Sequence, residues 1–170
     1  MTSTGNHPPV GQLQGVGRTE SSMTASKPRI LIVEDQMPVA MMMTFLLARA
    51  GCETAVATTG KKAMQMAEEK RFDLITLDVD LPDGNGFILC SRLKEHPRLC
   101  DTPVVFVSAR CLIEDQQHGL EVGAVDFIEK PFGTQDFLSR ILSHTEARFC
   151  PSDVLDENTD TDAQSLCNTP

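Results

Sequence analysis

The sequence contains no Trp and no Tyr, and its eight Phe residues bring the aromatic content to only 5%. This scarcity disfavours the stacked aromatic platforms that bind single-stranded nucleic acid. Lys and Arg are also few, 15 against 24 Asp and Glu, which gives a net charge of −9. Because no basic run or stripe is present, we expect no direct contact with nucleic acid.

The chain also lacks a long apolar segment. The longest one, residues 39–48, is interrupted by Thr44 and is too short to span a bilayer. The first residues contain neither a basic start nor an apolar run, so no signal peptide is predicted. These features lead us to expect a cytoplasmic protein with no membrane partner.

The cysteine pattern lacks any C-x-x-C pair and any His at the spacing of a zinc site. A disulfide framework is the alternative, but a chain of this length can build a core that needs no covalent staples. We therefore expect reduced thiols at Cys52, Cys90, Cys100, Cys111, Cys150 and Cys167.

Both ends of the chain differ in composition from the middle. Residues 1–26 are rich in Gly, Ser, Thr and Pro, and residues 149–170 contain five acidic residues and no Lys or Arg. Such segments cannot bury enough apolar surface to order themselves, so both are predicted to be disordered. Met23 is a hypothetical start of translation. The predicted domain covers residues 27–148.

Within that domain, short apolar runs alternate with helical patterns. Five strands are predicted, at residues 29–33, 53–57, 74–77, 104–107 and 124–128. The clearest helix carries Val39, Met42, Met43, Leu46 and Leu47 at helical spacing, which predicts that its methionines pack in the core. Five successive strand–helix units with apolar central strands predict an α/β fold, a parallel sheet with helices on both faces.

Acidic side chains follow two of the central strands. Glu34 and Asp35 come directly after residues 29–33, and Asp78 and Asp80 come after residues 74–77. Ligands of open α/β sheets bind outside the carboxyl ends of the strands. Carboxylates that meet there need a counter-charge, and oxygen ligands suit Mg²⁺.

Two later strands end in groups that suit a phosphoryl ligand. Ser108 and Ala109 offer a hydroxyl and a backbone N–H, and Lys130 offers an ammonium. An Asp carboxylate is a known nucleophile in phosphoryl transfer. In such a site, a cation and the Lys ammonium would neutralise the negative charge of the phosphoryl group. The hydroxyl and the backbone N–H would donate hydrogen bonds to its oxygens.

The strings ILIVEDQ, LITLDVDLPDGNGF, VVFVSA and GAVDFIEKPF, in this order, resemble receiver domains of two-component response regulators. The similarity covers about residues 28–147, and the chain resembles a stand-alone receiver of the chemotaxis-regulator type. It implies a flavodoxin-like doubly wound five-stranded sheet of order 2-1-3-4-5. It also implies a phosphorelay function.

The resemblance assigns the metal and acceptor roles residue by residue. Asp78 would be the phospho-acceptor and Asp35 the direct ligand of Mg²⁺, with Mn²⁺ as a substitute. Glu34 would act beside Asp35, and Asp80 would offer its backbone carbonyl to the metal.

The family's remaining positions concern the phosphoryl group and the switch. Ser108 would bond a phosphoryl oxygen, Ala109 would contribute its N–H, and Lys130 would pair with the phosphoryl group. Phe127 stands at the aromatic position that turns inward on activation; the alternative is a residue simply half-buried at the sheet edge. The resemblance further implies a phosphodonor partner, a sensor histidine kinase or a phosphotransfer protein.

Two positions depart from the usual family pattern. Asp80, two residues after the acceptor, and Arg110, two after Ser108, are charged. We expect them to form an ion pair at the rim of the site that affects rates rather than stability, with two independent solvated side chains as the alternative.

The chain as given ends after the fifth predicted helix without an effector domain. Output is therefore expected from docking of an unknown partner on the surface of the fourth helix, fifth strand and fifth helix. The resemblance implies a signalling domain and not an enzyme, apart from its own phosphoryl transfer and slow dephosphorylation.

Two other functions fit part of the pattern. Asp78-x-Asp80 resembles the nucleophile motif of haloacid-dehalogenase phosphohydrolases, although that family places it on the first strand. A flavin-binding module shares the topology, but the loop VEDQMP is acidic and lacks phosphate-binding hydroxyl and glycine residues. A receiver that works without phosphorylation is a further alternative, although each chemically required residue is present.

Overall fold

A computed structural model of the chain describes residues 27–110 and 112–146. The segments predicted to be disordered, 1–26 and 149–170, lie outside the described residues, and so does the hypothetical start Met23. Three of the cysteines, Cys111, Cys150 and Cys167, also lie outside them. The other three, Cys52, Cys90 and Cys100, are free thiols, as expected.

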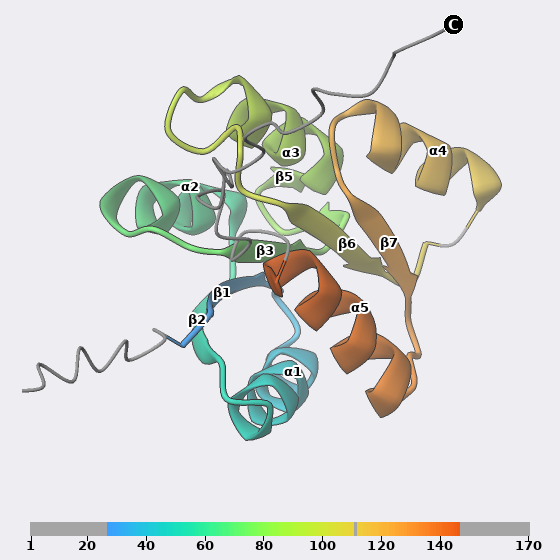
Figure 1. The fold of residues 1–170 in the computed structure, drawn as a ribbon. Coiled ribbons are helices and arrows are strands. Elements are labelled where there is room, and N and C mark those ends of the chain that lie inside the picture. The colour runs from blue at the N-terminus through green and yellow to red at the C-terminus, as the bar shows by residue number, and fades with distance from the viewer. Residues whose placement is uncertain (1–26, 111, 147–170) are drawn as a thin grey trace, which may run out of the picture.

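The central feature is a five-stranded parallel sheet (Figure 1). Its strands lie in the order β2-β1-β3-β6-β7, which confirms the expected 2-1-3-4-5 arrangement. The three inner strands read as continuous apolar runs because both of their faces are covered. The strands are β1 (Arg29–Val33), β2 (Glu53–Ala57), β3 (Leu74–Leu77), β6 (Val104–Ser108) and β7 (Asp126–Glu129).

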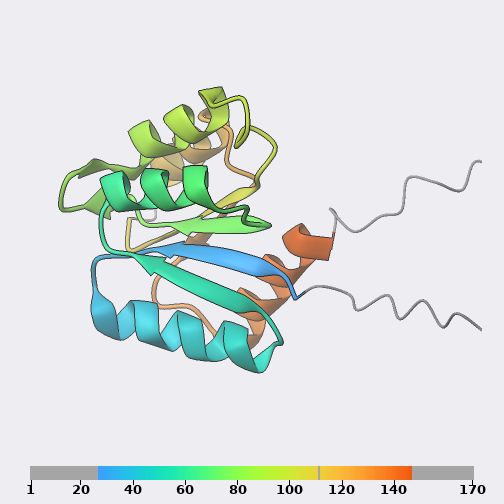
Figure 2. The ribbon, with the colours of Figure 1, turned by 90° about the vertical axis from the view of Figure 1, so that its left-hand side faces the viewer.

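Helices cover both faces of this sheet, as predicted. In Figures 1 and 2, α1 and α5 lie on one side of the sheet, whereas α2, α3 and α4 lie on the other. Their bounds are α1 (Met37–Arg49), α2 (Gly60–Glu69), α3 (Gly86–Glu95), α4 (Ile113–Glu121) and α5 (Thr134–Glu146).

The apolar core is divided into two clusters by the sheet. One packs Met43 and Leu47 of α1 and Phe137 and Ile141 of α5 against strand residues such as Ile32. The other includes alanines of α2 and Phe87, Cys90 and Leu93 of α3. A parallel sheet of this kind leaves the carboxyl ends of the strands as the open edge, where polar side chains gather.

The methionines of α1 correct one expectation. Met43 is buried, but Met41 and Met42 are 65% and 45% exposed. The buried residues of α1 are Ala40, Met43 and Leu47, which lie on one side of the helix, so only part of the apolar stretch is covered. The prediction that Met41 and Met42 pack in the core is therefore wrong.

A short hairpin is a second difference from the sequence expectation. Strands β4 (Asp80–Leu81) and β5 (Gly84–Asn85) pair antiparallel between β3 and α3. Asp83 in its turn accepts hydrogen bonds from the backbone N–H groups of Gly60 and Lys61, at 2.7 and 2.8 Å. The hairpin is thus tied to the first turn of α2.

Among the described residues, no helix combines the length and apolar character that crossing a bilayer requires.

Candidate functional site

The acidic side chains that follow β1 and β3 converge, as expected. The two strands are parallel neighbours with Val33 opposite Leu77, so Glu34 and Asp78 leave the sheet side by side. One carboxylate oxygen from each of Glu34, Asp35 and Asp78 lies within 4.8 Å of the others. Glu34 and Asp78 are 1% and 4% exposed, so water screens their charges poorly.

Lys130 supplies a positive charge to this cluster from the end of β7. Its Nζ donates to Oε2 of Glu34 and to Oδ2 of Asp78, both at 2.6 Å. The ammonium side chain is itself only 12% exposed. The Lys130–Pro131 peptide bond is cis. A residue 52 positions away in the sequence thus contacts Asp78 directly.

The pKa of Glu34 is raised above its ordinary value. Burial is the main cause, the contact with Lys130 opposes it, and the charge of Asp78 adds to it. The ammonium of Lys130 therefore does not fully offset the cost of burying the charged carboxylate of Glu34. Hard oxygen ligands in this number fit a divalent cation such as Mg²⁺, with room for water in its shell.

Asp80 and Arg110 form the expected ion pair at the rim of the site. Arg110 Nη1 lies 3.6 Å from Oδ1 of Asp80, and the two side chains are 49% and 70% exposed. The backbone N–H of Asp80 donates to Oδ1 of Asp78 at 3.3 Å. The role of the Asp80 carbonyl as a metal ligand stays a prediction.

Ser108 lies beside Lys130. It is the last residue of β6 and is buried; the backbone N–H of Lys130 donates to its carbonyl at 2.9 Å. Its Oγ accepts the backbone N–H of Arg110 at 3.2 Å. Ala109 follows at an exposed position, and its predicted N–H contact with a phosphoryl oxygen is untested by this geometry.

Phe127 is buried, although β7 is an edge strand. Its side chain is on the α4 side, its ring centroid lies 5.7 Å from that of Phe106, and the residue is 8% exposed. The alternative of a half-buried residue at the sheet edge is therefore wrong. A Cβ atom on Gly119 of α4 would come within 3.2 Å of the Phe127 ring and 3.1 Å of Phe106.

Sequence reasoning missed the contribution of Gly86. A Cβ atom there would lie 2.1 Å from the carbonyl oxygen of Asp78, so only glycine lets α3 begin against this backbone. The N–H of Gly86 donates to the carbonyl of Val79 at 2.7 Å. The second glycine of the string DGNGF was the available signal for such a close approach.

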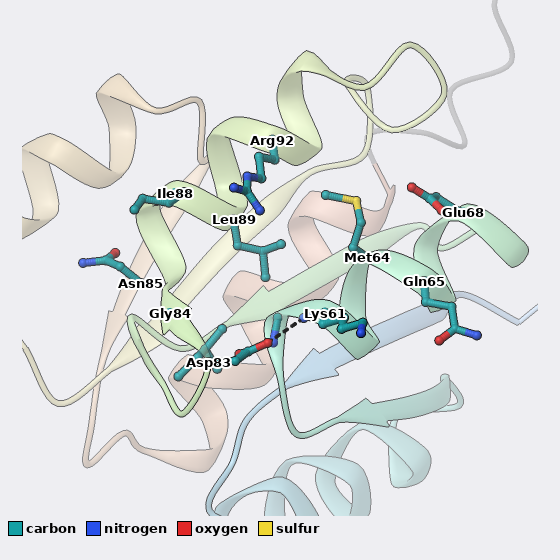
Figure 3. A pocket seen from close by; sticks show the side chains of 12 residues that line it. Lys61, Met64, Gln65, Glu68, Asp83, Gly84, Asn85, Ile88, Leu89 and Arg92 are labelled. Carbon is teal, nitrogen blue, oxygen red and sulfur yellow. Dashed lines mark hydrogen bonds between the residues drawn. The ribbon is translucent and has the colours of Figure 1, made fainter.

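A hollow of about 800 Å³ lies elsewhere, between α2, the β4–β5 hairpin and α3 (Figure 3). Its lining includes Met64, Leu89 and Arg92 but none of the site carboxylates Glu34, Asp35 or Asp78. Figure 3 shows Asp83 at its edge, bonded to the backbone of Lys61. The chemistry therefore belongs to the carboxylate cluster rather than to this hollow.

Comparison with known proteins decides the family. A profile described as the response regulator receiver domain matches residues 30–142, well over half of the chain. The chain belongs to the response regulator receiver family. Receiver domains are phosphorylated on an Asp by a kinase in two-component signalling. Membership of this family excludes the two alternatives, a haloacid-dehalogenase phosphohydrolase and a flavin-binding module.

Individual relatives agree with this placement. The chain is 40% identical over 113 residues to the phosphate regulon transcriptional regulatory protein PhoB of Escherichia coli (strain K12), covering 66% of this chain and 49% of PhoB. It is 36% identical over 114 residues to the DNA-binding dual master transcriptional regulator RpaA of Synechocystis, covering 67% and 47%. The chain thus spans about half the length of these curated relatives.

A solved receiver structure shares the whole fold. The chemotaxis protein CheY4 of Vibrio cholerae matches with a TM-score of 0.66 and 28% identity, covering 69% of this chain and 98% of CheY4. The receiver fold of this chain is therefore shared with a protein that consists almost wholly of that fold.

Proposed function

We propose that this receiver accepts a phosphoryl group on Asp78. The supporting observation is the position of its carboxylate, next to Glu34 and Asp35 and in contact with Lys130. An oxygen of Asp78 attacks the phosphorus of a phospho-His, the P–O bond forms, and the P–N bond breaks. The imidazole leaves with the electron pair and takes up a proton, which makes it a neutral leaving group.

The remaining site residues stabilise the transferred charge. Glu34, Asp35 and Asp78, with the backbone carbonyl of Asp80, would hold Mg²⁺, or Mn²⁺ in its place. The cation supplies charge neutralisation at the phosphoryl oxygens. Lys130 releases one of its two carboxylates to pair with the phosphoryl group, and the Ser108 hydroxyl and the Ala109 N–H hold further oxygens.

Phosphorylation is read out through Ser108 and Phe127. The Ser108 hydroxyl, now bonded to the Arg110 backbone, turns to the phosphoryl oxygen and leaves that N–H free. The Phe127 ring packs beneath α4, so its position is linked to that helix. Since Phe127 lacks the hydroxyl of Tyr, apolar burial alone sets its preference.

The donor is a sensor histidine kinase or a phosphotransfer protein, and the output partner is a further protein. We place these reactions in the cytoplasm, where the ATP that charges a kinase is found. The chain catalyses only its own phosphoryl transfer and slow dephosphorylation.

Intact mass spectrometry after incubation with acetyl phosphate and Mg²⁺ tests the acceptor. Wild type should gain the mass of one phosphoryl group, and Asp78→Asn should gain none because an amide is not a nucleophile here. Asp101→Asn, the same change at an exposed position, is the matched control and should gain the group normally. Chelation of the divalent cation should abolish the gain in wild type. Phosphorylation of Asp78→Asn at the wild-type level would overturn the assignment.

A further inference from the structure

The segment that joins Asp78 to α3 contains a hairpin that is too small to hold its own position. Its strands β4 and β5 pair at only two positions, Asp80 with Asn85 and Leu81 with Gly84. An isolated two-stranded hairpin is at best marginally stable in water, and every residue of this one except Leu81 is exposed. The position of the hairpin therefore depends on contacts with the rest of the fold.

At its base, the hairpin is joined to Asp78 and to the start of α3. The backbone N–H of Asp80 donates to Oδ1 of Asp78 at 3.3 Å, and the N–H of Gly86 donates to the carbonyl of Val79 at 2.7 Å. Both contacts lie where the hairpin begins and ends. Neither involves its turn, so the turn needs an anchor of its own.

At its turn, the hairpin is held by Asp83. One carboxylate oxygen accepts the N–H of Gly60 at 2.7 Å, and the other accepts the N–H of Lys61 at 2.8 Å (Figure 3). These donors lie in the first turn of α2, where backbone N–H groups have no partner within the helix and the helix dipole favours a negative charge. The same two hydrogen bonds hold the pKa of Asp83 below its ordinary value. Asp83 is therefore a charged clamp between the hairpin and α2.

The first turn of α2 is itself connected to the carboxylate cluster. The backbone N–H of Glu34 donates to the carbonyl of Ala57, the last residue of β2, at 3.0 Å. Only two residues separate Ala57 from Gly60. A short path therefore runs from Glu34 through the end of β2 to the N–H groups that donate to Asp83.

The hairpin completes this path in the other direction. From Asp83 the chain leads back to Asp80, whose N–H donates to Asp78. The N–H of Asp78 in turn donates to the carbonyl of Val33 at 3.0 Å, and Val33 directly precedes Glu34. Hydrogen bonds and short chain segments thus form a closed ring that passes through Glu34 and Asp78, and Asp83 provides its link between the hairpin and α2.

From this ring we infer that Asp83 is a positioning residue for the divalent cation. Asp83 is not itself one of the clustered carboxylates; its clamp keeps the backbone of Asp80 in place beside Asp78. The inference rests on the proposed function, in which the Asp80 carbonyl is a ligand of the cation. A ligand that is already in place does not have to be ordered when the cation binds, so the clamp raises the affinity for Mg²⁺.

A role in capping α2 alone is the alternative, and the structure allows the two roles to be separated. The N-cap of α2 is Thr59, whose Oγ1 accepts the N–H of Lys62 at 3.2 Å. Thr59→Ala would weaken the same end of the helix and leave both hydrogen bonds of Asp83 in place. Loss of a contact that only stabilised α2 would lower the free energy of unfolding and leave Mg²⁺ binding unchanged.

Titration of the unphosphorylated chain with Mg²⁺, followed through its amide resonances, tests the inference. Asp83→Ala removes the clamp and should raise the Kd for Mg²⁺ about tenfold, at the lower end of the loss that is usual for contacts that orient metal ligands. Asp83→Asn keeps one acceptor oxygen without the charge and should raise the Kd about threefold. Because Asp83→Asn is the milder change, it decides the test if Asp83→Ala does not fold.

Asp73→Ala is the matched control. The Asp73 carboxylate accepts the backbone N–H of Arg29 at 2.7 Å, and so it also joins two segments that are distant in the sequence. These residues lie at the start of β1 and directly before β3, at the end of the sheet opposite to the site. Asp73→Ala and Thr59→Ala should both leave the Kd for Mg²⁺ within about twofold of the wild-type value, whatever they cost in stability.

Wild-type affinity for Mg²⁺ in the Asp83 variants would overturn the inference, and so would an equal rise in Kd in Asp73→Ala or Thr59→Ala. A wild-type chain that binds no Mg²⁺ would instead contradict the metal site of the proposed function. The titration of wild type therefore separates a failure of the proposed function from a failure of the positioning role.

Discussion

At the scale of single residues, Lys130 supplies the positive charge that contacts the buried carboxylates of the site. Its ammonium contacts Glu34 and Asp78 at 2.6 Å each, so it already neutralises part of the cluster before any cation binds. A phosphoryl group on Asp78 would bring new negative oxygens to the same ammonium. Glu34 would then lose its partner and, being buried, would depend on the divalent cation for its counter-charge.

The ion pair of Asp80 and Arg110 at the rim of the site leads to a prediction about the rate at which the phosphorylated form decays. The pair lies beside Asp78 and is well exposed, so its contribution to stability is small, but we expect it to hinder the approach of water to Asp78. We expect Asp80→Asn and Arg110→Ala each to speed the decay of the phosphorylated form by up to about fivefold. The double variant should decay no faster than either single variant.

Decay of the acyl phosphate, followed by intact mass over time, measures this effect. Arg110→Ala keeps the backbone N–H that donates to Ser108 Oγ. A change in the decay rate can therefore be assigned to the lost guanidinium and not to the Ser108 contact. Arg92→Ala, an exposed arginine on α3, is the matched control. Additive effects of the two substitutions would show that the side chains act independently.

At the scale of the elements, α4 packs on the sheet through its buried residue Gly119. Gly119 fits against the rings of Phe106 and Phe127, with ring atoms 3.1 and 3.2 Å from the position of a Cβ atom. Gly119→Ala should therefore push a ring aside. Overpacking usually costs about 1–3 kcal/mol, and the better helix propensity of Ala returns up to about 1 kcal/mol. We expect a net loss of about 1 kcal/mol in the free energy of unfolding.

Denaturant unfolding followed by far-ultraviolet circular dichroism measures that loss, since the chain has no Trp. The loss should be smaller in a Phe127→Leu background, with a coupling of at least about 0.5 kcal/mol. Gln117→Ala, on the exposed surface of the same helix, controls for helix propensity. An equal loss in both backgrounds would show that Gly119 and Phe127 are not coupled.

The elements also show what the sequence could predict. Strands β1, β2 and β3 were predicted with their exact bounds. The inner strands β1 and β3 read as apolar runs between polar residues, whereas β2 is a partly exposed edge strand with a weaker apolar pattern. The β4–β5 hairpin was missed: its strands have two residues each, and its turn is bonded to α2 more than 20 positions earlier in the chain. The exposure of Met42 was missed because spacing alone does not fix which side of an apolar helix meets the sheet.

For the site, the strand ends predicted which residues converge, but only with the strand order that the family resemblance supplied. The joint contact of Lys130 with Glu34 and Asp78 depends on side-chain reach across the sheet edge, and no spacing in the sequence encodes it. The same holds for Gly86, whose importance comes from the approach of another backbone segment.

At the scale of the whole molecule, contacts between charged side chains of different elements also contribute to the stability of the fold. The fifth helix is joined to the sheet by Asp126, whose carboxylate accepts hydrogen bonds from Arg140 Nε at 2.8 Å and from Arg140 Nη2. His144 Nε2 lies 3.4 Å from the same carboxylate. These contacts connect β7 to the second half of α5.

The pKa of Asp126 predicts how this connection responds to acid. Burial alone would raise this pKa, but hydrogen bonds from Arg140 and from the backbone N–H of Phe127 outweigh burial and hold it below its ordinary value. A carboxyl whose pKa is lower in the folded state stabilises the fold above its unfolded pKa of about 4 and loses that contribution as pH falls through the folded pKa. Protonation of Asp126 in acid therefore weakens the attachment of α5.

Arg140→Ala should remove about 1–2 kcal/mol from the free energy of unfolding at neutral pH, the usual value for a charged hydrogen bond that is partly exposed. As pH falls below about 4, wild type should lose this advantage, so the two unfolding curves should converge. Asp136→Asn removes the outer, exposed partner of Arg140 and should change stability little at any pH. Denaturant unfolding at several pH values measures all three proteins. A constant difference between wild type and Arg140→Ala from neutral pH into acid would contradict the role of Asp126, because an uncharged carboxyl cannot attract the guanidinium as its ionised form does.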